Sequence, residues 1–248
     1  MTKAASIMDI TMTTESVPEM DPAGVRLQRL MTWLSPAFPV GAFSYSHGLE
    51  AAVETGMVTD RAMLAVWVET IVTTGAGRID AALFRAAHEA LTENDMDALG
   101  WAVERGDVLR PTRELGLETA SQGTAFIGAV DRHWPAAALT DLIALAERED
   151  REIAYPVAVG AAAATHDIAV APALEGYLHA FAANIVSAGV RAIPLGQSDG
   201  LHVLAALEPI IVAAAARVCP IEDLGSAAIM VDWASAIHET QYTRLFRS

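Results

Sequence analysis

A serine between two glycines is the most direct candidate for covalent catalysis in this chain. Residues Gly196-Gln197-Ser198-Asp199-Gly200 match the G-x-S-x-G pattern, in which a serine on a sharp strand-to-helix turn acts as a nucleophile. The pattern requires a core strand before the serine, and residues 188–195 contain Gly189 and Pro194 and do not resemble one. We therefore favour a loop between helices with Ser198 or Asp199 as an N-cap, and keep a serine hydrolase as a minor alternative.

The other residue types that support catalysis or metal binding are not spaced for it. None of the seven histidines forms an i, i+4 pair, and none lies beside Cys219, the only cysteine. Gly75-Ala76-Gly77 starts like a dinucleotide fingerprint, but Asp80 stands where the third glycine belongs, so a hinge between helices is favoured. Lys3 is the only lysine, which excludes a P-loop or a Schiff base in the interior. We predict no enzyme, no metal site and no firmly bound cofactor.

The C-terminal residues 238–248 are basic and aromatic at the end of an acidic chain. Tyrosine and arginine dominate the hot spots of protein interfaces, and both occur here. One interpretation is a tail that becomes ordered on contact with a partner. The other, weighted equally, is a last turn docked on the chain's own core. The candidate partner-binding residues are Tyr242, Arg244, Leu245, Phe246, Arg247 and Ser248.

A second candidate surface is the segment 35–50, which interrupts an otherwise helical chain. It contains two prolines, which set turns, and two glycines, which permit backbone shapes that a side chain forbids. Connections between helices are usually short and polar, whereas this one is long and aromatic. We expect it to pack near a partner surface through Phe43, Tyr45 and His47.

Composition limits the partners of the chain. Its 248 residues carry a formal net charge of -15, so phosphate backbones would be repelled and nucleic-acid binding is not expected. The hydrophobic fraction is 53%, but the run Ala154–Ala164 is too short to span a bilayer, and the run ending at Ala216 is limited by Glu208 and Arg217. We expect no membrane span, a cytoplasmic location, and an oligomer or complex that covers the excess apolar surface.

Helical periodicity extends over most of the chain, and no strand ladder or fixed repeat is evident. Residues 1–23 lack periodicity and are expected to be a disordered lead, 24–237 to form one layered all-α domain of about ten helices, and 238–248 to form the tail. The expected helices cover 24–34, 47–55, 59–74, 79–87, 92–105, 110–134, 138–148, 156–167, 172–188, 199–218 and 224–237.

Three motifs together resemble one known family. The segment Leu34-Ser35-Pro36 through Pro39-Val40-Gly41 to Phe43-Ser44-Tyr45-Ser46-His47-Gly48-Leu49-Glu50 is similar to the N-terminal signature of the urease accessory protein UreF family. Ile193-Pro194-Leu195-Gly196-Gln197-Ser198-Asp199-Gly200 resembles its internal motif, and the ending 238–248 resembles its terminal motif. Ser198, Thr243 and Ala42 replace the commoner Thr, Ser and Gly.

The resemblance implies a non-enzymatic, all-α homodimer that binds the accessory protein UreD (also called UreH). The complex is expected to recruit the GTPase UreG and to dock on apo-urease. Nickel is handled by the complex rather than by firm ligands on this chain, and is delivered with GTP hydrolysis. In the family the tail becomes ordered on binding UreD, and the tail arginine corresponds to Arg244. An alternative function is regulation of GTP hydrolysis by an inserted arginine, Arg244 or Arg247.

Overall fold

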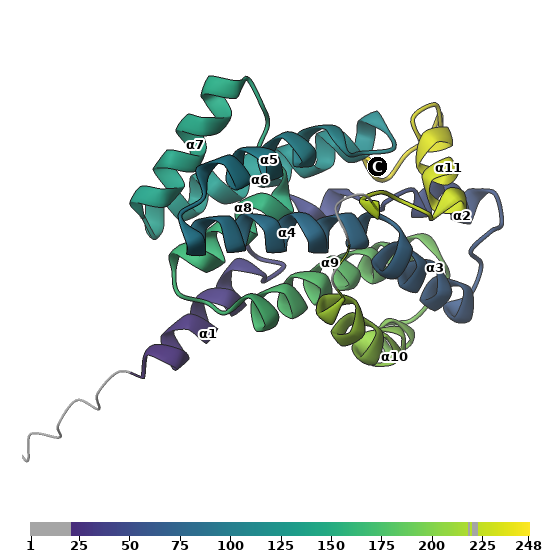
Figure 1. The fold of residues 1–248 in the computed structure, drawn as a ribbon. Helices are drawn as coiled ribbons and strands as arrows, with labels where there is room; N and C mark the ends of the chain where they lie inside the picture. Colours follow the sequence, from purple (N-terminus) through teal and green to yellow (C-terminus); the bar gives the residue numbers. More distant parts are fainter. Residues whose placement is uncertain (1–20, 218, 220–222) are drawn as a thin grey trace, which may run out of the picture.

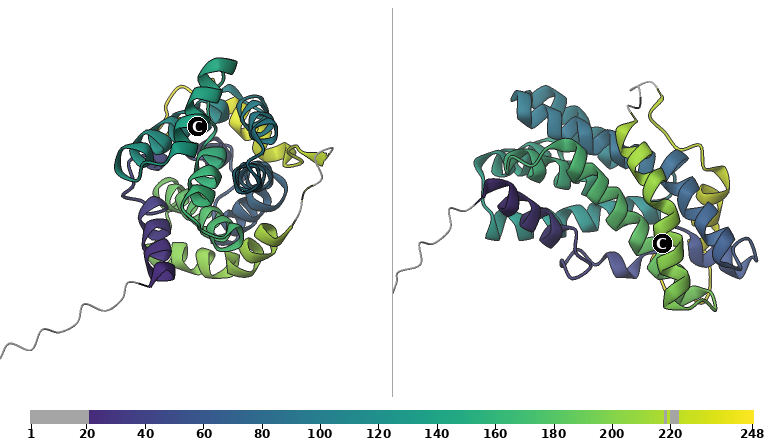
Figure 2. Two further views of the ribbon diagram at one scale, coloured as in Figure 1. Left: turned by 60° about the vertical axis from the view of Figure 1, so that its left-hand side comes forward. Right: turned by 90° about the horizontal axis from the view of Figure 1, so that it is seen from below.

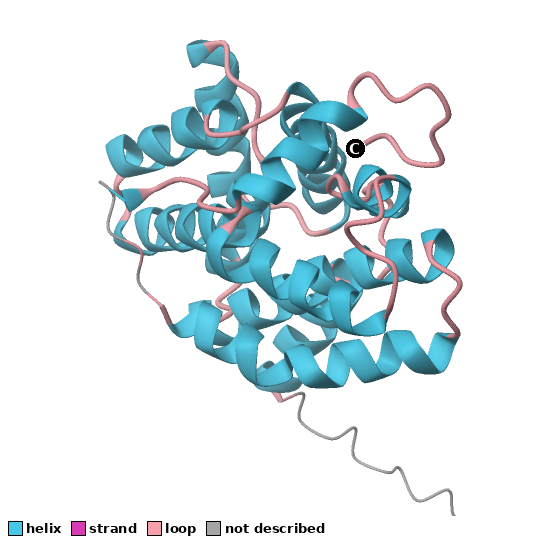
Figure 3. Cartoon of the chain, turned by 90° about the vertical axis from the view of Figure 1, so that its right-hand side faces the viewer, coloured by secondary structure: helices cyan, strands magenta, loops and turns pink. Residues whose placement is uncertain are grey.

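The computed structural model describes residues 21–217, 219 and 223–248, and every regular element in these ranges is a helix (Figure 3). The predicted all-α single domain is confirmed. The helices are α1 (Pro22–Trp33), a 3-10 turn η1 (Ala42–Ser44), α2 (Leu49–Glu54), α3 (Arg61–Thr74), α4 (Ala76–Glu93), α5 (Met96–Val108), α6 (Arg113–His133), α7 (Ala137–Glu149), α8 (Tyr155–Thr165), α9 (Val170–Ala192), α10 (Gln197–Ala216) and α11 (Ile229–His238) (Figure 1).

Helix α8 forms the centre of the domain. All its residues from Pro156 to Ala163 are buried, mainly against α4 and α6. Gly160 allows this close packing, since a Cβ there would lie 2.3 Å from the carbonyl oxygen of Phe84 on α4. Around this centre, α1 lies at one end of the molecule and α11 at the other (Figures 1 and 2).

Local capping explains where several helices begin and end. The Asp60 carboxylate accepts a hydrogen bond from Met63 N–H and starts α3, and the break expected at Gly75 separates α3 from α4. The expected helix 92–105 is wrong at both ends. Asn94, at a φ of 57°, ends α4, and Asp95 caps α5, which continues through Gly106 to Val108.

The ends of the chain also differ from expectation. Asp21 caps α1, so this helix begins at Pro22, inside the expected lead, while residues 1–20 lie outside the described residues. Helix α11 begins at Ile229 rather than at 224, and just before it Ala227 N–H bonds to the carbonyl of Thr74 at the end of α3 rather than to an acceptor within a helix. Val218, the expected end of α10, is not described.

Helix α10 bears on the prediction that the chain has no membrane-spanning segment. Within the described part of the chain it is the one helix long and apolar enough to cross a bilayer, and 28% of its apolar window is buried. Arg217, which we expected to limit this run, lies just beyond the helix. Length and composition alone are weak evidence, because helices of soluble domains meet the same criteria.

A buried ionic group joins α4, α9 and the loop before α6. Arg110 donates to Asp80 at 2.8 Å, and the hydroxyl of Tyr177 donates to the other Asp80 oxygen at 2.7 Å. Burial, followed by the nearby Asp80 charge, raises the pKa of Tyr177 and of Tyr155 above the ordinary value. Both phenols therefore keep their protons in the folded state at alkaline pH.

We expect Tyr177→Phe to lower the free energy of unfolding by about 1.5–3 kcal/mol at neutral pH, because it removes a hydrogen bond to a buried charge. A raised folded-state pKa stabilises the fold below the unfolded pKa of about 10, and that contribution is lost as the pH rises above it. As the pH rises above ~10, the free energy of unfolding should therefore fall less in the variant than in the wild type. Urea denaturation at a series of pH values measures both effects.

Tyr242→Phe is the matched control, because the Tyr242 side chain is fully exposed. It should change neither the stability nor its pH dependence. Equal stabilities for Tyr177→Phe and the wild type would show that the Asp80 hydrogen bond does not contribute.

Candidate functional site

The two segments singled out in the sequence meet at one place in the structure. The segment 43–50 contains His47 and Gly48 in the left-handed region, with φ of 55° and 72°, immediately before α2. A Cβ on Gly48 would lie 2.6 Å from the backbone nitrogen of Ser235 on α11. Only glycine satisfies both requirements, so α2 and α11 can approach closely here.

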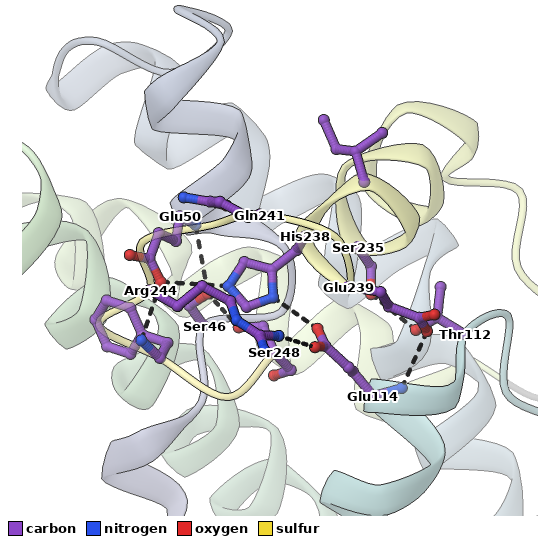
Figure 4. Close-up of polar contacts among 12 residues, drawn as sticks. Ser46, Glu50, Thr112, Glu114, Ser235, His238, Glu239, Gln241, Arg244 and Ser248 are labelled. Atoms are coloured by element: carbon purple, nitrogen blue, oxygen red, sulfur yellow. Dashed lines mark hydrogen bonds and ion pairs between the residues drawn. The ribbon is translucent and has the colours of Figure 1, made fainter.

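The C-terminal tail, residues 239–248, runs back from α11 along this segment. Ser46 N–H donates to the main-chain oxygen of Ser248 at 2.9 Å, and Arg247 N–H donates to the carbonyl oxygen of Ser44 at 2.8 Å. The Ser46 hydroxyl also donates to the main-chain oxygen of Ser248 (Figure 4). The tail is thus docked on the chain's own core, which is the second of the two interpretations weighed from the sequence.

Glu50 on α2 is the first of three carboxylates that hold the tail. Its side chain is 10% exposed. It accepts the backbone N–H groups of Leu245 at 2.7 Å and Phe246 at 2.9 Å, and His238 Nε2 lies 3.2 Å away. Hydrogen bonds to an ionised acceptor are roughly twice as strong as neutral ones, so Glu50 fixes the tail backbone.

Glu114 on α6 is the second carboxylate and shares His238 with Glu50. His238 Nδ1 lies 2.6 Å from Glu114 Oε2, and Arg244 donates to Glu114 Oε1 at 2.5 Å (Figure 4). Both ring nitrogens of His238 thus face carboxylate oxygens, one from each acid. Arg244 adds a positive charge beside Glu114.

Glu118, one turn further along α6, is the third carboxylate. It accepts the hydroxyl of Ser248 at 2.7 Å, and His47 Nδ1 lies 3.2 Å away. Gln122 donates to its other oxygen at 3.1 Å. The His47 ring also packs edge-on against Phe181, with centroids 4.9 Å apart. His47 therefore has a structural role at the junction of the segment and the tail.

Arg191 on α9 is a contact that the sequence did not reveal. Its guanidinium lies 3.7 Å from the ring centroid of Phe43 and 4.6 Å from that of Phe246. It also donates to the Phe43 carbonyl oxygen at 3.0 Å. Burial lowers the pKa of Arg191 from its ordinary value. Arg191 thus contacts both the segment 35–50 and the tail. No local sequence pattern around residue 191 predicts these contacts.

The candidate residues divide into anchors and exposed groups. Tyr45, His47, Phe246 and Ser248 are buried. The exposed groups are Phe43, Tyr242, Arg244, Leu245 and Arg247, and Leu245 is 74% exposed. A partner that approaches this conformation can reach the second group but not the first.

The other sequence candidates are not part of this site. Ser198 is exposed in the first turn of α10, after the loop that follows α9, so no strand precedes it. The N-cap is Gly196, and Asp199 accepts its N–H at 3.1 Å, so the cap expected at Ser198 or Asp199 is corrected. No group of three or more His, Cys, Asp or Glu in the described ranges could hold a metal ion.

We expect Glu50→Ala to release the tail, because it removes the acceptor of two tail amides and leaves His238 with one carboxylate. Each lost charge-assisted hydrogen bond contributes about 1.5–3 kcal/mol, so protection of the Leu245 and Phe246 amides should fall roughly 10- to 100-fold. Hydrogen–deuterium exchange of a peptide covering 240–248 measures this.

Glu54→Ala, four residues later on the same helix and exposed, is the control and should leave the exchange unchanged. Equal protection of the tail in Glu50→Ala and the wild type would contradict the anchoring role of Glu50.

Comparison with known proteins agrees with the resemblance. The family model described as UreF matches residues 58–208. A urease accessory protein UreF of Bradyrhizobium sp. (strain ORS 278) is 49% identical over 224 residues, which are 90% of this chain and 92% of that protein. One of Rhodopseudomonas palustris (strain BisB5) is 47% identical over 238 residues, 95% of this chain and 97% of the relative. The chain therefore belongs to the UreF family of urease accessory proteins.

Proposed function

We propose that this chain is a non-enzymatic scaffold for nickel insertion into urease, and that the docked tail presents its contact surface for UreD/UreH. In this proposal the complex recruits the GTPase UreG and docks on apo-urease in the cytoplasm, with the chain as a homodimer. The complex handles nickel as cargo. The family membership supports a role in urease maturation, and the partners are inferred from it.

The observation that carries the proposal is the division of the tail into buried anchors and exposed contact groups. Glu50 and Glu114 fix the backbone and Arg244, while Tyr242 and Leu245 remain exposed beside them. Ordering a flexible segment costs binding free energy, so a tail that is already fixed binds a partner more tightly than a free one. Tyrosine and arginine in such a position are typical of hot spots.

This division also decides which variant tests the proposal. Deleting residues 242–248 would remove donors from Glu50, Glu114 and Glu118. Leaving a buried charge unpaired costs several kcal/mol, so the deletion would weaken the fold as well as the surface. Substitutions at exposed tail positions separate the two effects.

The double variant Tyr242→Ala/Leu245→Ala should weaken binding to the cognate UreD/UreH about 30-fold or more, because each truncated hot-spot residue costs on the order of 2 kcal/mol. Titration of the purified partners measures Kd, and urease activation in a cell producing all accessory proteins gives a second readout. The thermal stability of the variant should equal that of the wild type.

Met96→Ala, at an exposed apolar residue on α5, is the control and should bind as the wild type does. The proposal fails if the wild type does not bind UreD/UreH, or if the double variant binds and activates urease normally.

Regulation of GTP hydrolysis is the second candidate function. Arg247 is a better candidate than Arg244 for the arginine that is inserted beside the nucleotide. Arg244 is paired with Glu114, whereas Arg247 is exposed and makes no ion pair with the described residues. If Arg247 is inserted beside the nucleotide of UreG, the complex should hydrolyse GTP ~10³-fold faster than UreG alone, and Arg247→Ala should abolish the acceleration.

Arg148→Ala on α7, an exposed arginine beside Glu149, is the control. GTP hydrolysis that is the same with and without the wild-type chain would exclude this candidate.

A further inference from the structure

An apolar groove lies between α3 and α11, outside the network of the tail. Its volume is about 600 Å³, and the loop between α2 and α3 closes one side with Met57 and Val58. Met63 and Val66 contribute from α3. The bond from Ala227 N–H to the Thr74 carbonyl, at 2.8 Å, ties the start of the α11 segment to the end of α3.

The side chains at this groove are far more exposed than apolar residues of a helical core. The exposed fractions are 77% for Ile229, 62% for Val66, 55% for Met230 and 45% for Met63. Trp233, one turn along α11 from Met230, is 46% exposed. Large apolar side chains concentrated in one place mark an interaction surface.

Helix α11 connects this groove to the tail site. Ser235 and His238 are buried and contact Thr112, Glu50 and Glu114, while Ile229, Met230 and Trp233 remain exposed. The helix continues directly into the tail, so a partner bound at the tail lies within reach of the groove. The two surfaces share one structural element.

The charge around the groove restricts what can fill it. Glu54, Asp60 and Glu69 are exposed on α2, before α3 and on α3, and Asp232 is partly exposed on α11. Arg61 is the one arginine in residues 49–74 and 229–238, and it is paired with Asp199 at 3.2 Å. These acids, which we call the rim, outnumber the one arginine on the elements that line the groove, and their charge favours a positively charged occupant.

We propose that this groove receives an apolar α-helix with basic flanking residues, supplied by the same accessory partner that contacts the tail. The inference rests on the proposed function and adds a second contact surface to it. A groove between two helices suits the apolar face of a third, and methionines adapt to the side chains they meet. The rim would repel an anionic membrane, and a second copy of this chain, with 31 acids and 16 bases, complements it less well than a basic helix does.

Single charge insertions at the groove test the proposal. Met63→Glu and Met230→Glu place a carboxylate in the apolar contact and should each weaken binding to the cognate UreD/UreH about 10-fold or more. Met96→Glu is the matched control, because Met63 and Met96 are methionines in the first turn of a helix with exposed fractions of 45% and 42%. It should bind as the wild type does.

Glu69→Lys tests the charge of the rim. It should slow association with the partner, and the difference from the wild type should shrink at high salt, because rim charges act mainly on the association rate. Circular dichroism and thermal melting of each full-length variant confirm that the fold is retained. An association rate equal to that of the wild type at low salt would contradict the charge argument.

The outcomes separate this inference from the proposed function. If the wild type does not bind UreD/UreH, the proposed function fails. If the wild type binds and the folded groove variants bind equally well, the groove inference is overturned and the proposed function stands. If Met63→Glu or Met230→Glu changes the oligomeric mass and leaves partner binding unchanged, the groove binds a second copy of this chain and the groove inference is overturned. If the wild type binds anionic lipid vesicles, and the groove variants lose this binding but still bind the partner, the groove is a membrane contact and the groove inference is overturned.

Discussion

The arrangement of the site depends on the need to pair two buried glutamates and a third that is partly buried. Glu50, Glu114 and Glu118 have side chains that are 10%, 12% and 6% exposed, and a carboxylate so placed is stable only with hydrogen-bond donors and positive charge around it. The tail supplies donors to all three, through two backbone amides, Arg244 and the Ser248 hydroxyl. The position of the tail is therefore part of the electrostatic balance of the core.

The helical domain holds these acids in place by close packing at its centre. The contact of α8 with α4 through Gly160, and the ionic group around Asp80, fix α4, α6 and α9 relative to one another. Helix α9 then directs Arg191 between Phe43 and Phe246. The site is thus built on rigid helices, and only its outermost side chains remain free to meet a partner.

Helix ends that depend on neighbouring residues could be predicted from the sequence. Contacts between residues far apart in the sequence could not. The cap at Asp60 and the break at Gly75 follow from local chemistry. Gly106 misled the prediction, because it serves close packing against Ala154 inside α5 rather than a helix end. Both segments of the site were identified, but their contact was not. No local pattern marks Arg191 or assigns Glu118 to the tail.

The bond between Ser46 and Ser248 spans 202 residues of sequence, and this separation has a consequence for the order of folding. Contacts between distant residues form late, and a chain that folds during synthesis orders its N-terminal part first. The glutamate of α2 is thus made long before the amides that pair with it. A chain interrupted before residue 245 leaves this carboxylate without the two amides that pair with it. The surface therefore forms only once the tail has been made, and an interaction that depends on it would discriminate against chains interrupted before this segment.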